Sequence, residues 1–176
     1  MFTKEYFSFF ILLSLNQNPN CHKTKNINNN NEKLSEKSLE QITRITKVID
    51  QTLDFQILLS GFEAGTLPED EFLIGYLLGY SDSIQQWNDI SLESTVGVTI
   101  MAKTFITQFG KERGLSIWRK YPLIGESSPK DLLEGVKVGG QDMHNFLMYG
   151  SEYSPMNLNA YLTGEEIYFK PPPKNS

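Results

Sequence analysis

Apolar residues in this chain recur three or four positions apart over most of its length, which is the spacing of one face of an α-helix. The first such stripe follows a polar stretch, and Ser38 stands where a helix cap is expected. The stripe consists of Leu39, Ile42, Ile45, Ile49 and Leu53. The apolar pattern continues or restarts from Asp54 to Ala64, and Gly65 then supplies a stop.

A second helix is predicted by the clearest start signal in the chain. Thr66 and Glu69 have the spacing of a capping box, and Pro68 suits the first turn, where its missing N–H costs nothing. The three acids Glu69, Asp70 and Glu71 favour the positive end of the helix dipole, and the alternative is that they ligate a cation. The core residues expected in this helix are Phe72, Tyr76, Leu77, Tyr80, Ile84 and Trp87.

The remaining helices are bounded by serine, glycine and proline. Ser91 is the expected cap of a helix over residues 92–109 that ends at Gly110, although its β-branched run TVGVTI also suits a strand. A helix around residues 115–121 stops at Pro122. Ser-Pro pairs at 128–129 and 154–155 start two more helices, the last of which ends at Gly164. The pattern predicts an all-α fold, a small bundle of about five or six helices over residues 38–165, with an extended tail at 166–176.

One phrase of the sequence occurs twice. Residues 58–73 and 132–147 match at six of sixteen positions with an offset of 74. Glycines four residues apart in a helix would leave a strip of backbone without side chains, and another helix could pack closely against that strip. The alternative is that Gly65 and Gly139–Gly140 form turns. We therefore expect two related helix-turn-helix units that face each other, with chance similarity as the alternative. The glycine pairs are Gly61 and Gly65, Gly75 and Gly79, and Gly135 and Gly139.

The N-terminus has the pattern of an export signal. A short leader with one lysine precedes a largely apolar run from Phe7 to Leu15, which is too short to span a bilayer. Residues 1–21 are therefore expected to be a signal or anchor segment, with a lipidated Cys21 or a segment that docks on the domain as alternatives. Residues 22–37 are polar and predict a flexible linker. We expect a protein of the periplasm or cell envelope; a cytoplasmic location stays open.

Charge is distributed unevenly along the chain. The net charge is −5, from 21 acids and 16 bases, which does not favour nucleic acid as a partner. Between Lys47 and Lys103 there are nine acids and no Lys or Arg, whereas residues 103–137 contain seven bases and four acids. The molecule should therefore be electrically polarised, and an acidic face left exposed would attract a basic protein.

Catalytic and metal-binding patterns are mostly missing from the sequence. There is no HExxH, GxSxG, Gly-rich phosphate loop or EF-hand pattern, and Cys21 is the only cysteine. An enzyme would have to use His144, and Asp142, two residues earlier, does not share its helical face and is more suited to cap the helix. Asp82 lies on the same face as Gly75 and Gly79, where it is either paired across packed helices or presented to a partner. No cofactor or metal is expected.

The stretch LLSGFEAGTLPEDEFLIGYLLGYSDSI, residues 58–84, resembles the core of the Rap/Tai-like family of type VI secretion immunity proteins. The resemblance consists of a Leu-Leu start, a short turn and a helix with the pattern Gly-Tyr-x-x-Gly-x-x-Asp, matched by Gly75, Tyr76, Gly79 and Asp82. It implies a non-enzymatic, helical periplasmic protein that binds a toxin.

Taken together, these patterns predict a small exported helical binding protein, an immunity-type inhibitor that contacts a basic protein partner through an acidic face. A generic envelope lipoprotein or structural protein is the first alternative, and a small enzyme that uses His144 is the second. Contact with a membrane is expected only through the N-terminal segment. The residues expected to contact the partner are Glu69, Asp70, Glu71, Asp82 and Asp89, with Tyr76, Tyr80 or Trp87 as aromatic anchors where they are exposed.

Overall fold

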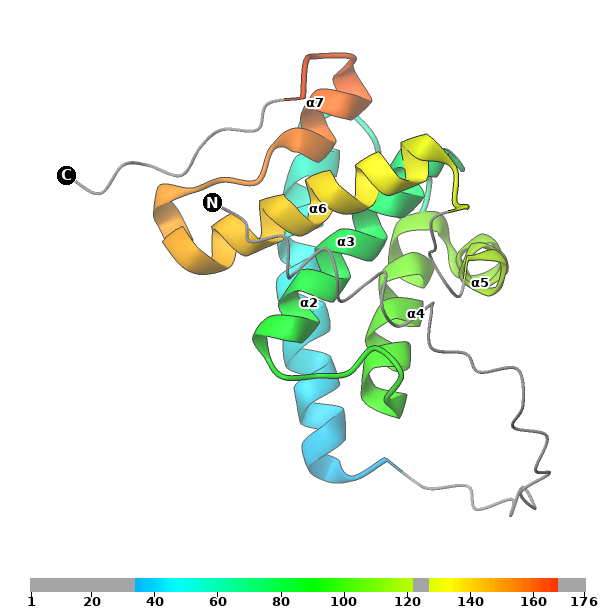
Figure 1. Cartoon of the computed structure of the whole chain (residues 1–176), viewed down its shortest axis with the longest axis vertical. Coiled ribbons are helices and arrows are strands. Elements are labelled where there is room, and N and C mark those ends of the chain that lie inside the picture. Colours follow the sequence, from blue (N-terminus) through cyan, green and yellow to red (C-terminus); the bar gives the residue numbers. More distant parts are fainter. Residues whose placement is uncertain (1–33, 122–126, 168–176) are drawn as a thin grey trace.

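The computed structural model describes residues 34–121 and 127–167 of the chain (Figure 1). These residues contain six α-helices, one short 3-10 helix and no strand, so the expected all-α fold is confirmed, including helix rather than strand at TVGVTI. The helices are α2 (Glu36–Leu59), α3 (Glu71–Trp87), α4 (Thr95–Phe109), α5 (Lys111–Lys120), α6 (Lys130–Tyr149), η1 (Gly150–Glu152) and α7 (Asn157–Thr163). The predicted signal run from Phe7 to Leu15, Cys21, most of the linker and most of the tail lie outside the described residues.

Helix α2 covers one side of the bundle with the predicted apolar stripe. Its inward positions are buried, from Ile42 to Ile57, but Leu39 is exposed because the first turns extend beyond the other helices. The cap is Ser35, whose Oγ accepts from the backbone N–H of Ser38, so the helix begins before the expected cap. It ends at Leu59, and Gly61 (φ 78°) rather than Gly65 is the first glycine of the following turn.

Helix α3 is the central helix and contacts α2, α4 and α6. Every residue from Phe72 to Asp82 is buried, which explains why this helix has no polar face. Its N-cap is Asp70, which accepts from the N–H of Leu73, so the expected capping box at Thr66 to Glu69 lies in the preceding loop. Trp87, expected in the core, is 51% exposed because it ends the helix at the surface.

Helix α4 packs against α2 and α3, and α5 packs against α4. Ser94 rather than Ser91 caps α4, and its Oγ accepts from the N–H of Gly97. Gly110 (φ 82°) ends α4 as predicted, and α5 turns back against it. At Gly114 a Cβ would overlap the carbonyl oxygen of Phe105, so glycine is what allows the two backbones this close.

The α3–α6 contact is made backbone to backbone through four glycines. A Cβ on Gly75 or Gly79 would overlap the carbonyl oxygen of Leu132 or Val136 in α6. A Cβ on Gly135 or Gly139 would overlap the carbonyl oxygen of Phe72 or Tyr76 in α3. Residues nearer the C-terminus of α3 contact residues nearer the C-terminus of α6, so the two helices are parallel. The predicted close approach is therefore confirmed for two of the three glycine pairs; Gly61 and Gly65 instead lie in the loop after α2, both with positive φ.

The related helix-turn-helix units expected from the repeated phrase are not found. The first copy ends α2, forms a loop and begins α3, whereas the second lies within α6, so the copies have different structures. Gly139 and Gly140 are mid-helix and form no turn. The contacts instead reveal an offset of 60, at which Leu73, Gly75, Gly79 and Asp82 match Leu133, Gly135, Gly139 and Asp142. Helices α3 and α6 are thus equivalent halves of one symmetric contact.

Candidate functional site

The acidic turn before α3 is partly used by the fold. Asp70 Oδ1 accepts from Tyr161 Oη of α7 at 2.8 Å as well as from the α3 cap N–H, and burial and this bond raise the pKa of Tyr161 to about 12. Lys120 of α5 is close enough to Glu69 and Glu71 to interact with both charges. Of the three acids, Glu69 is exposed, whereas Asp70 and Glu71 are half-buried. Lys120 therefore offsets part of the negative charge that the sequence concentrates here.

The other end of α3 presents an aromatic and acidic surface, the Trp87 patch, formed by Trp87, Asp89, His144 and Met148. The Trp87 ring meets the edge of the His144 ring with centroids 6.3 Å apart and planes at 76°. Met148 follows one helical turn after His144 and is 50% exposed. Asp89, in the loop after α3, is exposed and has a positive φ of 54°. Aromatic residues and methionine are enriched at protein interfaces, so the exposed Trp87 and Met148 make this surface a candidate for a protein contact.

The predicted partner-binding residues do not form one surface. Tyr76 and Tyr80 have no exposed area, and Asp82 is buried, because α3 is covered on all sides at these positions; they cannot contact a partner. Glu71 and Trp87 are the two ends of α3, about 24 Å apart at 1.5 Å per residue. Glu69 and Asp89 consequently lie at opposite ends of the bundle, and only Trp87 of the aromatic candidates is exposed.

Asp142 is the centre of a buried hydrogen-bond network that the sequence did not reveal. Its carboxylate accepts from Tyr76 Oη (2.8 Å), Tyr153 Oη (2.6 Å), Asn157 Nδ2 (2.7 Å) and the Asn157 backbone N–H (3.1 Å). Burial raises the pKa of Asp142, and these bonds oppose that rise. Gln56 of α2 extends the network, because its Nε2 donates to Tyr76 Oη at 3.4 Å and its Oε1 accepts from the backbone N–H of Leu158. Asp142 thus joins α3 and α6 to Tyr153 and to Asn157, the first residue of α7, and it does not cap α6, the helix that contains His144, as expected.

Asp82, the equivalent of Asp142 in α3, lacks such a network. Its Oδ2 accepts from Gln86 Nε2 at 2.6 Å, and its Oδ1 has no hydrogen-bond partner among the described residues. Val136 stands at the position in α6 that matches Tyr76 in α3, so the donor that serves Asp142 is missing here. Burial raises the pKa of Asp82 to about 7. Asp82 is neither paired across the helices nor presented to a partner.

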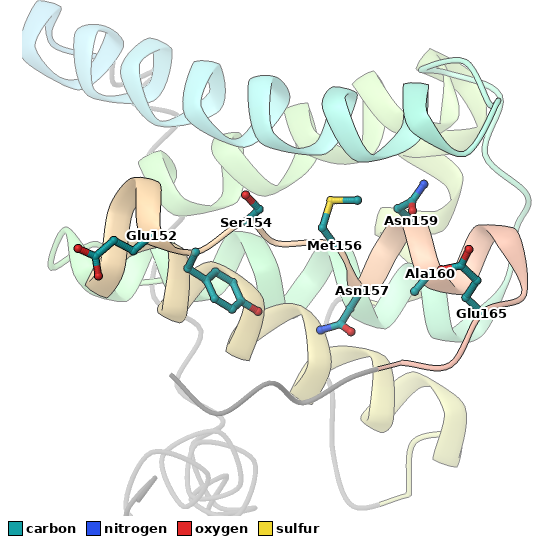
Figure 2. A pocket seen from close by; sticks show the side chains of 8 residues that line it. Glu152, Ser154, Met156, Asn157, Asn159, Ala160 and Glu165 are labelled. Carbon is teal, nitrogen blue, oxygen red and sulfur yellow. The ribbon is translucent and has the colours of Figure 1, made fainter. Parts of the chain in front are cut away.

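A cavity of about 390 Å³ opens beside the Asp142 network. Its lining comes from η1, the following segment, the start of α7 and Glu165 (Figure 2). Tyr153 and Asn157, two of the residues that line it, are the same two that donate to Asp142 from this segment. In Figure 2 Ser154, Met156 and Asn159 point toward α2, whereas Asn157 points toward α6. The buried carboxylate therefore fixes one wall of the cavity.

His144 and Asp142 do not form a catalytic pair. They lie on different faces of α6, and Asp142 accepts its hydrogen bonds from two tyrosines and an asparagine. Burial lowers the pKa of His144, which favours its neutral form.

Within residues 34–121 and 127–167, no group of three or more His, Cys, Asp or Glu side chains is arranged to hold a metal ion. None of the helices described there is long and apolar enough to cross a membrane.

Comparisons of the chain with protein-family models, with curated proteins and with solved structures find no match. They therefore do not test the resemblance of residues 58–84 to immunity proteins. The structure adds that Gly75, Tyr76, Gly79 and Asp82, which constitute the resemblance, are all buried in α3. In this fold the pattern is one of helix packing.

A signal for Asp142 was present in the sequence. The offset of 60 aligns a glycine pair and an aspartate in two helices, which marks both aspartates as equivalent. Tyr153 and Asn157 could not have been found in this way, because Tyr153 follows η1 and Asn157 begins α7, both outside the two matching helices. Their roles depend on how that segment folds back over α6.

Proposed function

We propose that the protein is a small exported binding protein that holds a basic protein partner against the Trp87 patch. The supporting observation is Trp87 itself, a large aromatic side chain that is 51% exposed at the end of a helix whose residues 72–82 are all buried. Tryptophan is highly buried on average in folded proteins and is enriched among the residues that dominate binding at the centre of protein interfaces. The exposed carboxylates Asp89 and Glu93 in the adjacent loop would attract a cationic partner.

The family resemblance extends this proposal to inhibition. Under it, the partner is a toxin effector that the protein neutralises in the cell envelope. The buried glycine-rich pattern then supplies the scaffold, and residues at the end of α3 supply the contact. An apolar run from Phe7 to Leu15 supports export, since it has the length of a signal-peptide core.

Affinity capture from a native envelope extract tests the proposal. The bait proteins are the wild type, Trp87→Ala and Phe55→Ala, the last of which removes a similarly exposed ring (54%) from α2. We expect one basic protein to be retained by the wild type and by Phe55→Ala, lost with Trp87→Ala, and retained less as salt rises. Capture of the same proteins by all three baits, or of none, contradicts the proposal and favours a generic envelope component.

A further inference from the structure

The cavity beside Asp142 has an unbalanced set of charges. Glu152 and Glu165 line it, and Figure 2 shows them at opposite ends of the row of lining residues. The other lining residues are uncharged, so no Lys, Arg or His side chain balances the two carboxylates within the lining. Its volume of about 390 Å³ lies within the range of about 300–1,000 Å³ that is usual for ligand sites.

The buried Asp142 carboxylate adds to this negative potential. All four of its hydrogen-bond donors, from Tyr76, Tyr153 and Asn157, are neutral groups, so when Asp142 is ionised no cation among them balances its charge. A carboxylate solvated only by dipoles acts on neighbouring space more strongly than one exposed to water. A cation in the cavity would gain this interaction without having to form the wall first, because Asp142 already orients Tyr153 and Asn157.

The lining also suits the shape of one class of cation. Tyr153 supplies an aromatic ring and Met156 a flexible thioether, which are favourable surfaces for the methylene stem and planar head of an arginine. Asn159 is an amide on the α2 side of the same space. Carboxylates at the ends with an aromatic and amides between them match a guanidinium better than a bare metal ion, which would need three or more clustered ligands.

We propose that this cavity binds the guanidinium or ammonium group of one Arg or Lys side chain of the protein partner. That the cation comes from a protein partner rests on the proposed function. That the cavity prefers a cation rests on the residues that line the cavity. It gives the protein a second, specific contact in addition to the Trp87 patch.

An NMR titration of the full chain with N-acetyl-arginine amide tests the cation preference. N-acetyl-citrulline amide is the matched control, since it has nearly the same shape and no charge. We expect saturable shift changes at the side-chain amides of Asn157 and Asn159, with the citrulline compound at least tenfold weaker. Equal binding of both compounds, or shifts spread over the whole surface, would overturn the proposal. If spermidine bound far more tightly than the arginine amide, the proposal that the bound cation is a side chain of a protein would be overturned.

Variants separate the cavity from general negative charge. Glu152→Gln/Glu165→Gln should weaken binding of the arginine amide at least fivefold. Glu112→Gln/Glu134→Gln removes the same charge from exposed residues outside the cavity and should leave binding unchanged. Equal effects of the two double variants would contradict a site in the cavity. A protein that binds the arginine amide but captures no partner would overturn the proposed function alone.

Discussion

Two aspartates at matching positions of α3 and α6 have opposite surroundings. Asp142 accepts four hydrogen bonds, whereas Asp82 accepts one and has a buried oxygen without a partner in the described part of the chain. An unsatisfied buried carboxylate oxygen is costly when ionised, and a fully satisfied one is costly to remove. The same substitution should therefore have different effects at the two positions.

Asp82→Asn is expected to stabilise the protein at high pH. The pKa of Asp82 is about 7 in the fold against 3.8 as its ordinary value, so the folded state holds the proton more tightly. The wild type is thus relatively most stable below pH about 4 and loses stability as pH rises toward 7. The variant lacks this loss, so its unfolding free energy at pH 8 should exceed that of the wild type by on the order of 4 kcal/mol. Urea unfolding at pH 4.5 and pH 8 measures it; a variant no more stable at pH 8 contradicts the assignment.

Asp142→Ala should be much more harmful than Asp82→Ala. The first leaves four donors without their acceptor, three of them on side chains, and the second leaves only the amide of Gln86, which is exposed to water. We expect the losses in unfolding free energy at pH 8 to differ by at least about 2 kcal/mol. Equal losses in urea unfolding would mean that the network around Asp142 does not stabilise the fold.

At the scale of elements, the pairing of α3 with α6 decides the architecture. Glycine costs roughly 1 kcal/mol in a helix relative to alanine, and four of them here are offset by dispersion contacts between two backbones. The sequence predicted this close approach because four-residue glycine spacing has a direct geometric meaning. Helix starts were predicted less well: Ser35, Asp70 and Ser94 cap where Ser38, Thr66 and Ser91 were expected, since several nearby side chains in each loop are able to cap.

Adjacent glycines of α6 provide a sharp test of this packing. A Cβ on Gly139 would overlap the carbonyl oxygen of Tyr76, whereas one on Gly140 would lie 3.5 Å from its nearest atom, which is ordinary contact. Gly139→Ala should therefore lower the unfolding free energy by at least about 2 kcal/mol. Gly140→Ala should be neutral or raise it by up to about 1 kcal/mol through helix propensity. Thermal unfolding of both variants measures this difference in stability. Similar melting temperatures would show that α6 does not pack against α3 as described.

On the scale of the whole molecule, the acidic residues divide between two ends. The count of acids in the sequence predicted an acidic face, but residues 69–71 and residue 89 lie at opposite ends of α3, and α5 brings Lys120 to the first group. Sequence order gives no direction in space, so one face could not be distinguished from two ends. The cavity was equally hidden, because it depends on the path of the chain between η1 and α7.

Charge reversal should accordingly affect partner capture at one end only. Asp89→Lys is expected to reduce capture at least tenfold, because it places a like charge beside the Trp87 patch. Glu69→Lys/Glu71→Lys should change capture less than twofold; Asp70 is left intact because it caps α3. Surface plasmon resonance with the captured protein measures the binding affinities of the Asp89 variant and of the Glu69/Glu71 variant relative to the wild type. A larger effect at Glu69 and Glu71 would move the contact to the start of α3.

The parallel pairing of α3 with α6 also determines when the core can be completed during synthesis. Its contacts join residues about 60 positions apart, and at roughly 5–20 residues per second the ribosome needs about 3–12 s to make the second helix after the first. During that interval α3, whose residues 72–82 are all buried in the finished fold, has α2 and α4 of the described helices to pack against but not α6. Long-range contacts of this kind slow folding and leave nascent chains open to aggregation. A chain that stops before Lys130 would keep the glycine strip of α3 uncovered, and such a product should be a substrate for chaperones and proteases.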